Sequence, residues 1–214
     1  MALQSEYNII ISGQQIPVIQ DFSLIEKMGE HTSFFLSVRA DVLELQSNDW
    51  SLLQDTKHFL GEEIGIQIQS ADTSDGYQEL EFKGIITNME MTKGFLASTG
   101  DIIHLEGYGS SIILDDGADH QSFVDTSVSE LIASVLGSYD RSRLRINIAP
   151  ENNTTVLYAV MNKESRFEFL QRMAKSRGEF FFYNKDTLYF GKADMGDDIV
   201  LTYGTDLKSF RLGL

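Results

Sequence analysis

The chain has 214 residues, a formal net charge of −15 and no cysteine. Its length allows one large domain or two small ones, and its 42% hydrophobic and 11% aromatic content excludes a disordered acidic tail. The lack of cysteine excludes a disulfide scaffold, a thiol nucleophile and cysteine-ligated metals, and the acidic balance argues against binding to nucleic acid.

The first half of the chain, up to residue 117, follows β-strand patterns. Ser12-Gly13-Gln14 is a turn signal between two short apolar runs, which predicts a hairpin. Ser33–Arg39 and Glu63–Gln69 alternate cleanly between apolar and polar residues, as half-buried strands do. Further strands are expected at Phe22–Met28, Leu80–Met91 and Asp101–Tyr108.

Glycines and one irregular stretch interrupt these strands. Gly84, in the middle of a strand, indicates a bulge or a close approach of two backbones. The segment Gly107–Ser111 lacks the lysine of a phosphate-binding loop, and we interpret it as the corner of a barrel. Residues 41–59 are expected to form a loop with a short helix around Trp50–Leu53.

The second half mixes helices with strands. Ser127–Glu130 and Ser165–Glu168 are capping-box patterns, and each is followed by apolar residues at helical spacing. Gly137 and Gly178 then end the two predicted helices. Hairpin strands are predicted at Phe180–Tyr183 and Thr187–Phe190, and a last strand is expected at Asp198–Tyr203.

No pattern in the sequence predicts an active site. The four histidines, at positions 31, 58, 104 and 120, lack the i, i+4 spacing of a helical metal site, and His104 is expected to be structural. Asp115, Asp116, Asp119 and His120 resemble the start of a hard-cation site but lack the spacing and closing glutamate of a calcium loop. We therefore predict no catalytic residue, no metal and no cofactor.

The aromatic run Phe180–Tyr183 has two interpretations. On a surface it would be a stacking platform for sugars or bases, and in the interior it would be a core strand. The run follows an amphipathic helix and its terminal glycine, which favours burial.

One long segment carries a family resemblance. Met161–Tyr183 (MNKESRFEFLQRMAKSRGEFFFY) resembles the helix–strand unit of VgrG proteins and of contractile-phage tail hub, or late-control, proteins. Phe82–Asn88 and Phe123–Ile132 are similar to that family's F-x-G strand and S-V-x-E helix start, and Ile146–Ile148 to its short strand. Asn162 departs from the usual Arg or Gly. The resemblance covers roughly residues 20–210.

The resemblance implies a mainly β fold with some helix (α+β). It places a first antiparallel β-barrel hub domain at residues 1–117 and a second, helix-decorated barrel-like domain at residues 118–214, with strands in 198–212 returning to the first barrel. It also implies a structural hub or baseplate component that joins a hexameric tube to a trimeric spike. The implied partners are a homo-trimer (of this chain, or only of the full-length form), an Hcp-like tube protein and a downstream spike domain, with no enzymatic activity.

The charge of the chain is divided unevenly between its halves. Residues 1–117 contain 19 acidic and 5 basic residues (net −14), whereas residues 118–214 contain 13 and 12 (net −1). Two ordinary solvated faces would also give this asymmetry. With the resemblance in view, we expect the acidic barrel of one subunit to meet a basic region of the next. The candidate subunit-interface cluster is Arg141, Arg143 and Arg145, and Lys163–Arg177 is the other basic region.

Two other functions remain open from the sequence: a carbohydrate-binding β module and a tail-associated peptidoglycan hydrolase. The first residues show neither a basic region nor a long apolar run, so no signal peptide or membrane insertion is expected. We predict assembly in the cytoplasm, with any export occurring as part of a secretion or tail machine.

Overall fold

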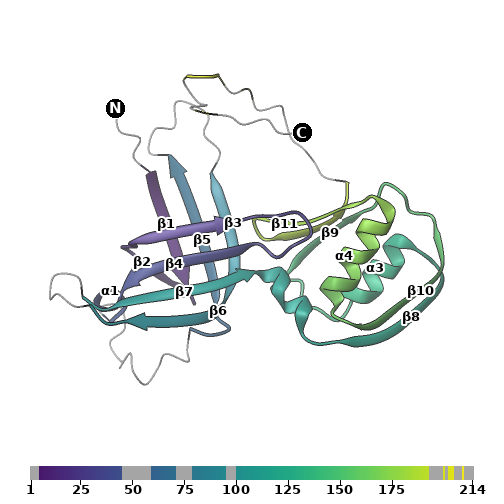
Figure 1. Ribbon diagram of the computed structural model, residues 1–214, viewed down its shortest axis with the longest axis horizontal. Coiled ribbons are helices and arrows are strands. Elements are labelled where there is room, and N and C mark those ends of the chain that lie inside the picture. The colour runs from purple at the N-terminus through teal and green to yellow at the C-terminus, as the bar shows by residue number, and fades with distance from the viewer. Residues whose placement is uncertain are drawn as a thin grey trace.

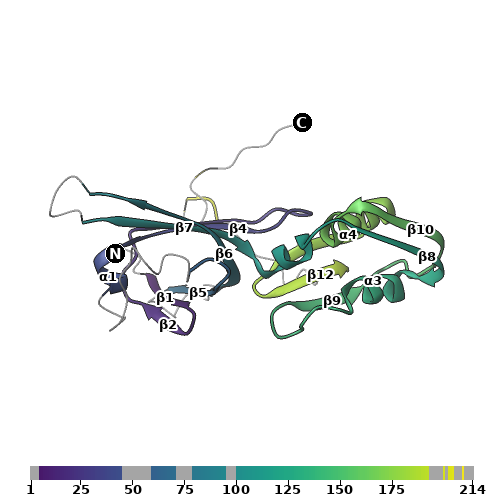
Figure 2. The ribbon, with the colours of Figure 1, turned by 90° about the horizontal axis from the view of Figure 1, so that it is seen from below.

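The computed structural model describes residues 5–44, 59–70, 79–94, 100–192, 200, 202–204 and 209. The described chain forms two parts that lie side by side along its long axis (Figure 1). One part is a large curled sheet, and the other combines two helices with two small sheets (Figures 1 and 2). The fold is thus mainly β with some helix, as predicted.

The large sheet has seven antiparallel strands in the order β2-β1-β5-β6-β7-β4-β3. The strands are β1 (Ser5–Ile11), β2 (Gln14–Ile16), β3 (Asp21–Ile25), β4 (Ser33–Arg39), β5 (Glu63–Ser70), β6 (Leu80–Thr92) and β7 (Ile102–Gly109). The sheet curls into a half-barrel (Figure 2), and a short helix, α1 (Ala40–Glu44), follows β4. Alternating aliphatic side chains fill its concave side, among them Ile9, Leu36, Ile64, Ile86, Ile103 and Leu105.

The predicted hairpin at the start of the chain is confirmed. Ser12 and Gly13 connect β1 to β2 with φ angles of 49° and 81°. Positive φ at both central residues gives a two-residue turn whose twist matches that of the flanking strands. Gly13 adopts this conformation without the steric cost that a side chain would bring.

The close approach expected at Gly84 is also confirmed. A Cβ placed there would lie 2.6 Å from the carbonyl oxygen of Tyr108. The bulge of this strand lies further along, because the β6–β7 register shifts between Ile86 and Asn88.

The second part starts after β7 with a 3-10 helix, η3 (Ser110–Asp115). It contains β8 (Asp119–Ser127), α3 (Val128–Leu136), β9 (Arg145–Ala149), β10 (Thr155–Glu164), α4 (Arg166–Arg177), β11 (Phe180–Asn184) and β12 (Thr187–Gly191). β8 and β10 pair as a two-stranded antiparallel ribbon. β11, β12 and β9 form a three-stranded sheet in which β12 and β9 run parallel.

Both predicted capping boxes are present. Ser127 and Ser165 each accept a hydrogen bond from the backbone three residues on, and Glu130 and Glu168 bond back to the cap. Gly178 ends α4 in the left-handed conformation at φ 69°, whereas Gly137 ends α3 with helical angles. The strand β8, which runs into the first cap, and the strand β10 were not predicted.

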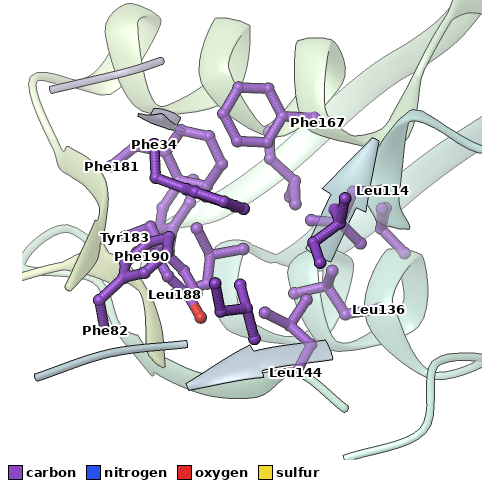
Figure 3. Packing of buried hydrophobic residues seen from close by; sticks show 14 of the residues in the cluster. Phe34, Phe82, Leu114, Leu136, Leu144, Phe167, Phe181, Tyr183, Leu188 and Phe190 are labelled. Atoms are coloured by element: carbon purple, nitrogen blue, oxygen red, sulfur yellow. The ribbon is translucent and has the colours of Figure 1, made fainter. Parts of the chain in front are cut away.

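One hydrophobic core runs through both parts (Figure 3). Phe34 and Phe82 come from the seven-stranded sheet, and Phe181 and Tyr183 come from β11; all four are at most 4% exposed. The ring of Phe82 meets the ring of Tyr183 edge-on, with centroids 6.4 Å apart. The two parts are therefore joined by packing as well as by the chain.

Three predictions lie outside the described residues, in whole or in most of their length. They are the short helix around Trp50–Leu53, the last strand at Asp198–Tyr203, and the return of residues 198–212 to the first barrel.

Candidate functional site

The joint between the two parts is fixed by hydrogen bonds across it. The backbone N–H of Lys83 donates to the carbonyl of Lys185 (2.9 Å), and that of Gly29 donates to the carbonyl of Phe181 (2.7 Å). The Tyr183 hydroxyl donates to the carbonyl of Lys83 (2.7 Å), and burial raises the pKa of this phenol to about 12. These bonds hold the β11–β12 hairpin against the seven-stranded sheet.

Glycines at the end of β7 allow this close contact. A Cβ on Gly107 would lie 2.0 Å from the carbonyl oxygen of Ile85, and one on Gly109 would lie 2.6 Å from the ring of Tyr183. The predicted corner at Gly107–Ser111 is therefore a site where backbone and rings approach closely, followed directly by η3.

His31 lies at the centre of the joint. Its ring stacks on Phe167 at 3.6 Å between centroids, its Nδ1 lies 2.9 Å from the Ser111 hydroxyl, and its Nε2 lies 3.0 Å from an Asp115 oxygen. Burial lowers the pKa of His31, and Asp115 opposes this shift only in part. Sequence reasoning missed this Ser–His–Asp set. Because Ser111 is 0% exposed, its hydroxyl has no access to a substrate and the set works as a packing contact.

The acidic group considered for a hard cation is occupied by an arginine. Arg166 donates to both oxygens of Asp116 (3.0 Å each), to Asp119 (2.9 Å) and to the Tyr139 hydroxyl (2.9 Å). Asp115 instead accepts from Ser165 at the start of α4 (2.5 Å). Burial raises the pKa of Tyr139 to about 12. Within the described ranges, no three His, Asp or Glu side chains are grouped to hold a metal ion.

The basic cluster Arg141, Arg143 and Arg145 lies on the surface, at and just before β9. Arg145 is paired with Asp186 (2.8 Å), and the guanidinium of Arg143 lies 3.8 Å from Glu63. For Arg141, no ion pair occurs with any residue that the structure describes. Two of the three charges thus face acids of the same chain.

A groove with a volume of about 820 Å³ adjoins this cluster. It lies on the outer face of β1, β5 and β6, where Gly65 leaves open space, and the β11–β12 turn forms one wall. Its charged walls are paired with each other, Lys83 with Glu63 (3.0 Å) and Lys185 with Glu81 (3.1 Å). These pairs largely balance the charges along the walls of the groove.

The aromatic run divides between the two interpretations. Phe181 and Tyr183 are each 3% exposed and belong to the core, in agreement with the interpretation of the run as a core strand. Phe182 faces the other side and stacks on Tyr189 (5.0 Å, 6° between planes), and Phe180 is 40% exposed. The rings of Phe182 and Tyr189 cover each other's faces, which weakens the case for a sugar platform. The ring of His104, which we expected to be structural, stacks on that of Phe35 with 5.5 Å between centroids.

Among the described helices, none is long and apolar enough to cross a membrane.

Comparisons with known proteins identify the family. The sequence profile of the phage tail baseplate hub (GPD) family matches residues 27–202. Comparison with curated proteins gives no match. Among solved structures, the chain is similar to a tail protein of Neisseria meningitidis MC58 (17% identity, TM-score 0.64), with 91% of this chain and 52% of that one covered.

Two further structures have the same fold. The 43 kDa tail protein of prophage MuSo2 from Shewanella oneidensis is 13% identical, with a TM-score of 0.63 over 89% of this chain and 54% of that one. An E. coli component of the type VI secretion system, described as similar to phage T4 tail proteins gp27 and gp5, is 11% identical (TM-score 0.59; 89% and 50% covered). The chain spans about half the length of these proteins.

The profile match covers most of the chain, and the half-barrel sheet with its helical second part has the fold of tail and secretion-system proteins. The chain therefore belongs to the phage tail baseplate hub (GPD) family, whose members are structural parts of phage tails.

Proposed function

We propose that this chain joins a hexameric tube to a trimeric spike in a phage tail or a type VI secretion system. The observation that carries the proposal is the family match over residues 27–202. In this role the chain forms a homo-trimer, binds an Hcp-like tube protein and connects to a downstream spike domain. It acts as a structural part without catalysing a reaction, it does not bind nucleic acid, and it does not insert directly into a membrane.

The curled seven-stranded sheet supports this role. Antiparallel strands leave β2 and β3 at the two edges of the described sheet, where a neighbouring subunit can meet them. In the proposed assembly, residues 1–117 form the first barrel and residues 118–214 the second, so that three subunits present six similar units to the tube.

The charge division supports a head-to-tail contact between subunits. In this arrangement the acidic barrel of one subunit meets the cluster Arg141, Arg143 and Arg145 of the next. Arg141 is the sharpest probe, since reversing Arg143 or Arg145 would also disturb the pairs with Glu63 and Asp186.

Binding to the purified tube protein tests the proposal. The 214-residue chain should bind tube rings in a pull-down and appear at one end of reconstituted tubes by electron microscopy. Arg141→Glu should weaken self-association and reduce its salt dependence, whereas Lys192→Glu, at an exposed site outside the cluster, should change it little. Absence of tube binding would refute the hub role, and an unchanged oligomer mass for Arg141→Glu would refute the contact.

A further inference from the structure

The segment between β3 and β4, residues 26–31, reaches from the seven-stranded sheet to the second part (Figures 1 and 2). We call this segment the β3–β4 turn. Four of its six residues are exposed, among them Met28 at 62%, and the other two, Gly29 and His31, are buried or half-buried. The attachment of the turn therefore depends on these two residues.

Gly29 and His31 attach the turn in different ways. The backbone N–H of Gly29 donates to the carbonyl of Phe181 (2.7 Å), and its carbonyl accepts from the side chain of Gln171. These bonds involve no titratable group. The side chain of His31 is 12% exposed, and its ring stacks on Phe167 of α4 with 3.6 Å between centroids. His31 is thus the part of the attachment that can change its charge.

One arrangement of protons satisfies both nitrogens of the His31 ring. Nε2 carries the proton and donates to the Asp115 carboxylate (3.0 Å), and Nδ1 accepts from the Ser111 hydroxyl (2.9 Å). The opposite tautomer would direct a lone pair of Nε2 at the carboxylate. Protonation puts an N–H at Nδ1 as well, so the Ser111 hydroxyl can no longer donate there. Ser111 is 0% exposed, and its hydroxyl then loses a hydrogen bond that water does not replace.

Few charged groups are placed to stabilise a protonated ring. Asp115, on η3, is the charged group that contacts the imidazole among the described residues. β7 presents the phenol of Tyr108, with ring centroids 6.1 Å apart, and Arg166 of α4 binds other carboxylates. Within the turn, Lys27 and Glu30 pair with each other (3.1 Å). A cation at this position therefore has one carboxylate as its partner.

This environment links the charge of the ring to the attachment of the turn. Burial lowers the pKa of His31, and Asp115 opposes this shift only in part. The ring binds a proton more weakly in the attached turn than in a released one, so protonation favours release. We propose that His31 is a pH-sensitive latch: its neutral ring holds the β3–β4 turn on η3 and α4, and its protonated ring releases the turn.

Release has a local consequence at the joint. It uncovers the ring of Phe167, which is 6% exposed, and it breaks the bond between Gly29 and Phe181 that joins the two parts. The latch would thus make one contact between the parts sensitive to pH while the shared core stays packed. It does not depend on the proposed hub role, and tube binding at neutral pH tests that role separately.

Electron paramagnetic resonance of a nitroxide attached to Met28→Cys tests the latch, since the chain has no cysteine of its own. The ratio of mobile to immobile label should rise by up to about tenfold from pH 7.5 to pH 5.5, the limit for one group with a pKa of 6.5 in the released turn. The matched label is attached to Val124→Cys, since Val124 is 61% exposed and lies on β8. Its ratio should stay constant, which separates release of the turn from unfolding of the chain.

Three substitutions in the Met28→Cys chain identify the group that titrates. His31→Gln has no proton to gain, so its label should not respond to pH. His120 is exposed on β8, and His120→Gln should respond as the parent does. Asp115→Asn removes the carboxylate that favours the protonated ring, so the mobile fraction at pH 5.5 should increase further.

Four results would overturn the latch. They are a constant ratio in the parent, the same pH response in His31→Gln as in the parent, a change at the Val124 label over the same pH range, and a mobile fraction in Asp115→Asn that does not exceed that of the parent at pH 5.5.

Discussion

Two glycines in strands of the seven-stranded sheet provide a matched test of the packing within that sheet. Gly107 lies in β7, and a Cβ there would be 2.0 Å from the carbonyl oxygen of Ile85 and 2.7 Å from the ring of Phe34. Gly65 lies in β5, and a Cβ there would have no atom within 4 Å. The same substitution to alanine should therefore have opposite effects at the two positions.

The expected magnitudes follow from these distances. Ordinary contacts of a Cβ begin near 3.4 Å. Gly107→Ala thus forces the backbones of β6 and β7 apart, at a cost of about 3 kcal/mol, the upper end of overpacking effects. Gly65→Ala meets open space and restricts the unfolded chain, for a gain of about 0.5 kcal/mol. For a chain of this size, 1 kcal/mol shifts the Tm by about 2–4 °C. Gly107→Ala should lower the Tm by about 6–12 °C, and Gly65→Ala should raise it by about 1–2 °C.

Differential scanning calorimetry of the two variants and the wild type at neutral pH provides the measurement. A Gly107→Ala variant that melts within 2 °C of the wild type, by the same scale, would show that the sheet adjusts freely at this corner. Equal destabilisation by both variants would mean that the loss reflects alanine in a strand and not the close approach at Gly107.

Three further predictions concern ionisable groups. Burial lowers the pKa of His31 from its ordinary value of 6.5, so the folded state accommodates the neutral imidazole more readily than the protonated one. The folded state should therefore lose stability as the pH falls below 6.5, where the unfolded chain takes up the proton first. In thermal melts at pH 7 and pH 5, His31→Gln should show a smaller loss of stability than the wild type. Burial raises the pKa values of Tyr183 and Tyr139 to about 12, so both phenols lose their protons more readily in the unfolded chain. The free energy of unfolding measured with urea should therefore fall as the pH rises from 10 to 12, and it should fall less in Tyr183→Phe. Arg166→Met should lower the free energy of unfolding by about 1–3 kcal/mol, because the Arg166 side chain is only 22% exposed and binds two carboxylates. Arg145→Met should lower it by less than about 0.5 kcal/mol, because the Arg145 side chain is 72% exposed. Equal losses for the two variants in chemical denaturation would contradict the stronger contribution of Arg166.

Local signals in the sequence predicted the local structure well. The serine and glutamate of each capping box lie three residues apart, so the contacts that start α3 and α4 are encoded within one helical turn. The hairpin at Ser12-Gly13 and the strand Ser33–Arg39 depend on neighbouring residues in the same way. The resemblance of Met161–Tyr183 also led to the correct family.

The missed elements have physical reasons. β8 buries only Phe123 along its nine residues. The buried positions of β10 do not alternate regularly, and its pairing with β8 shifts register once, between Asn162 and Glu164, so neither strand shows a clean two-residue period. The contacts of His31 with Ser111 and Asp115 join residues about 80 positions apart, which no local pattern encodes. The role of the basic cluster as a subunit contact stays a prediction.

The bond between Tyr183 and Lys83 also sets an order of events during synthesis. The two residues are 100 positions apart, and a ribosome that adds about 5–20 residues per second needs about 5–20 s to cover that distance. Until then the carbonyl of Lys83 and the ring of Phe82 have no partner from β11. The nascent seven-stranded sheet therefore passes through a stage with an incomplete apolar surface, during which a chaperone or premature aggregation competes with the arrival of the β11–β12 hairpin.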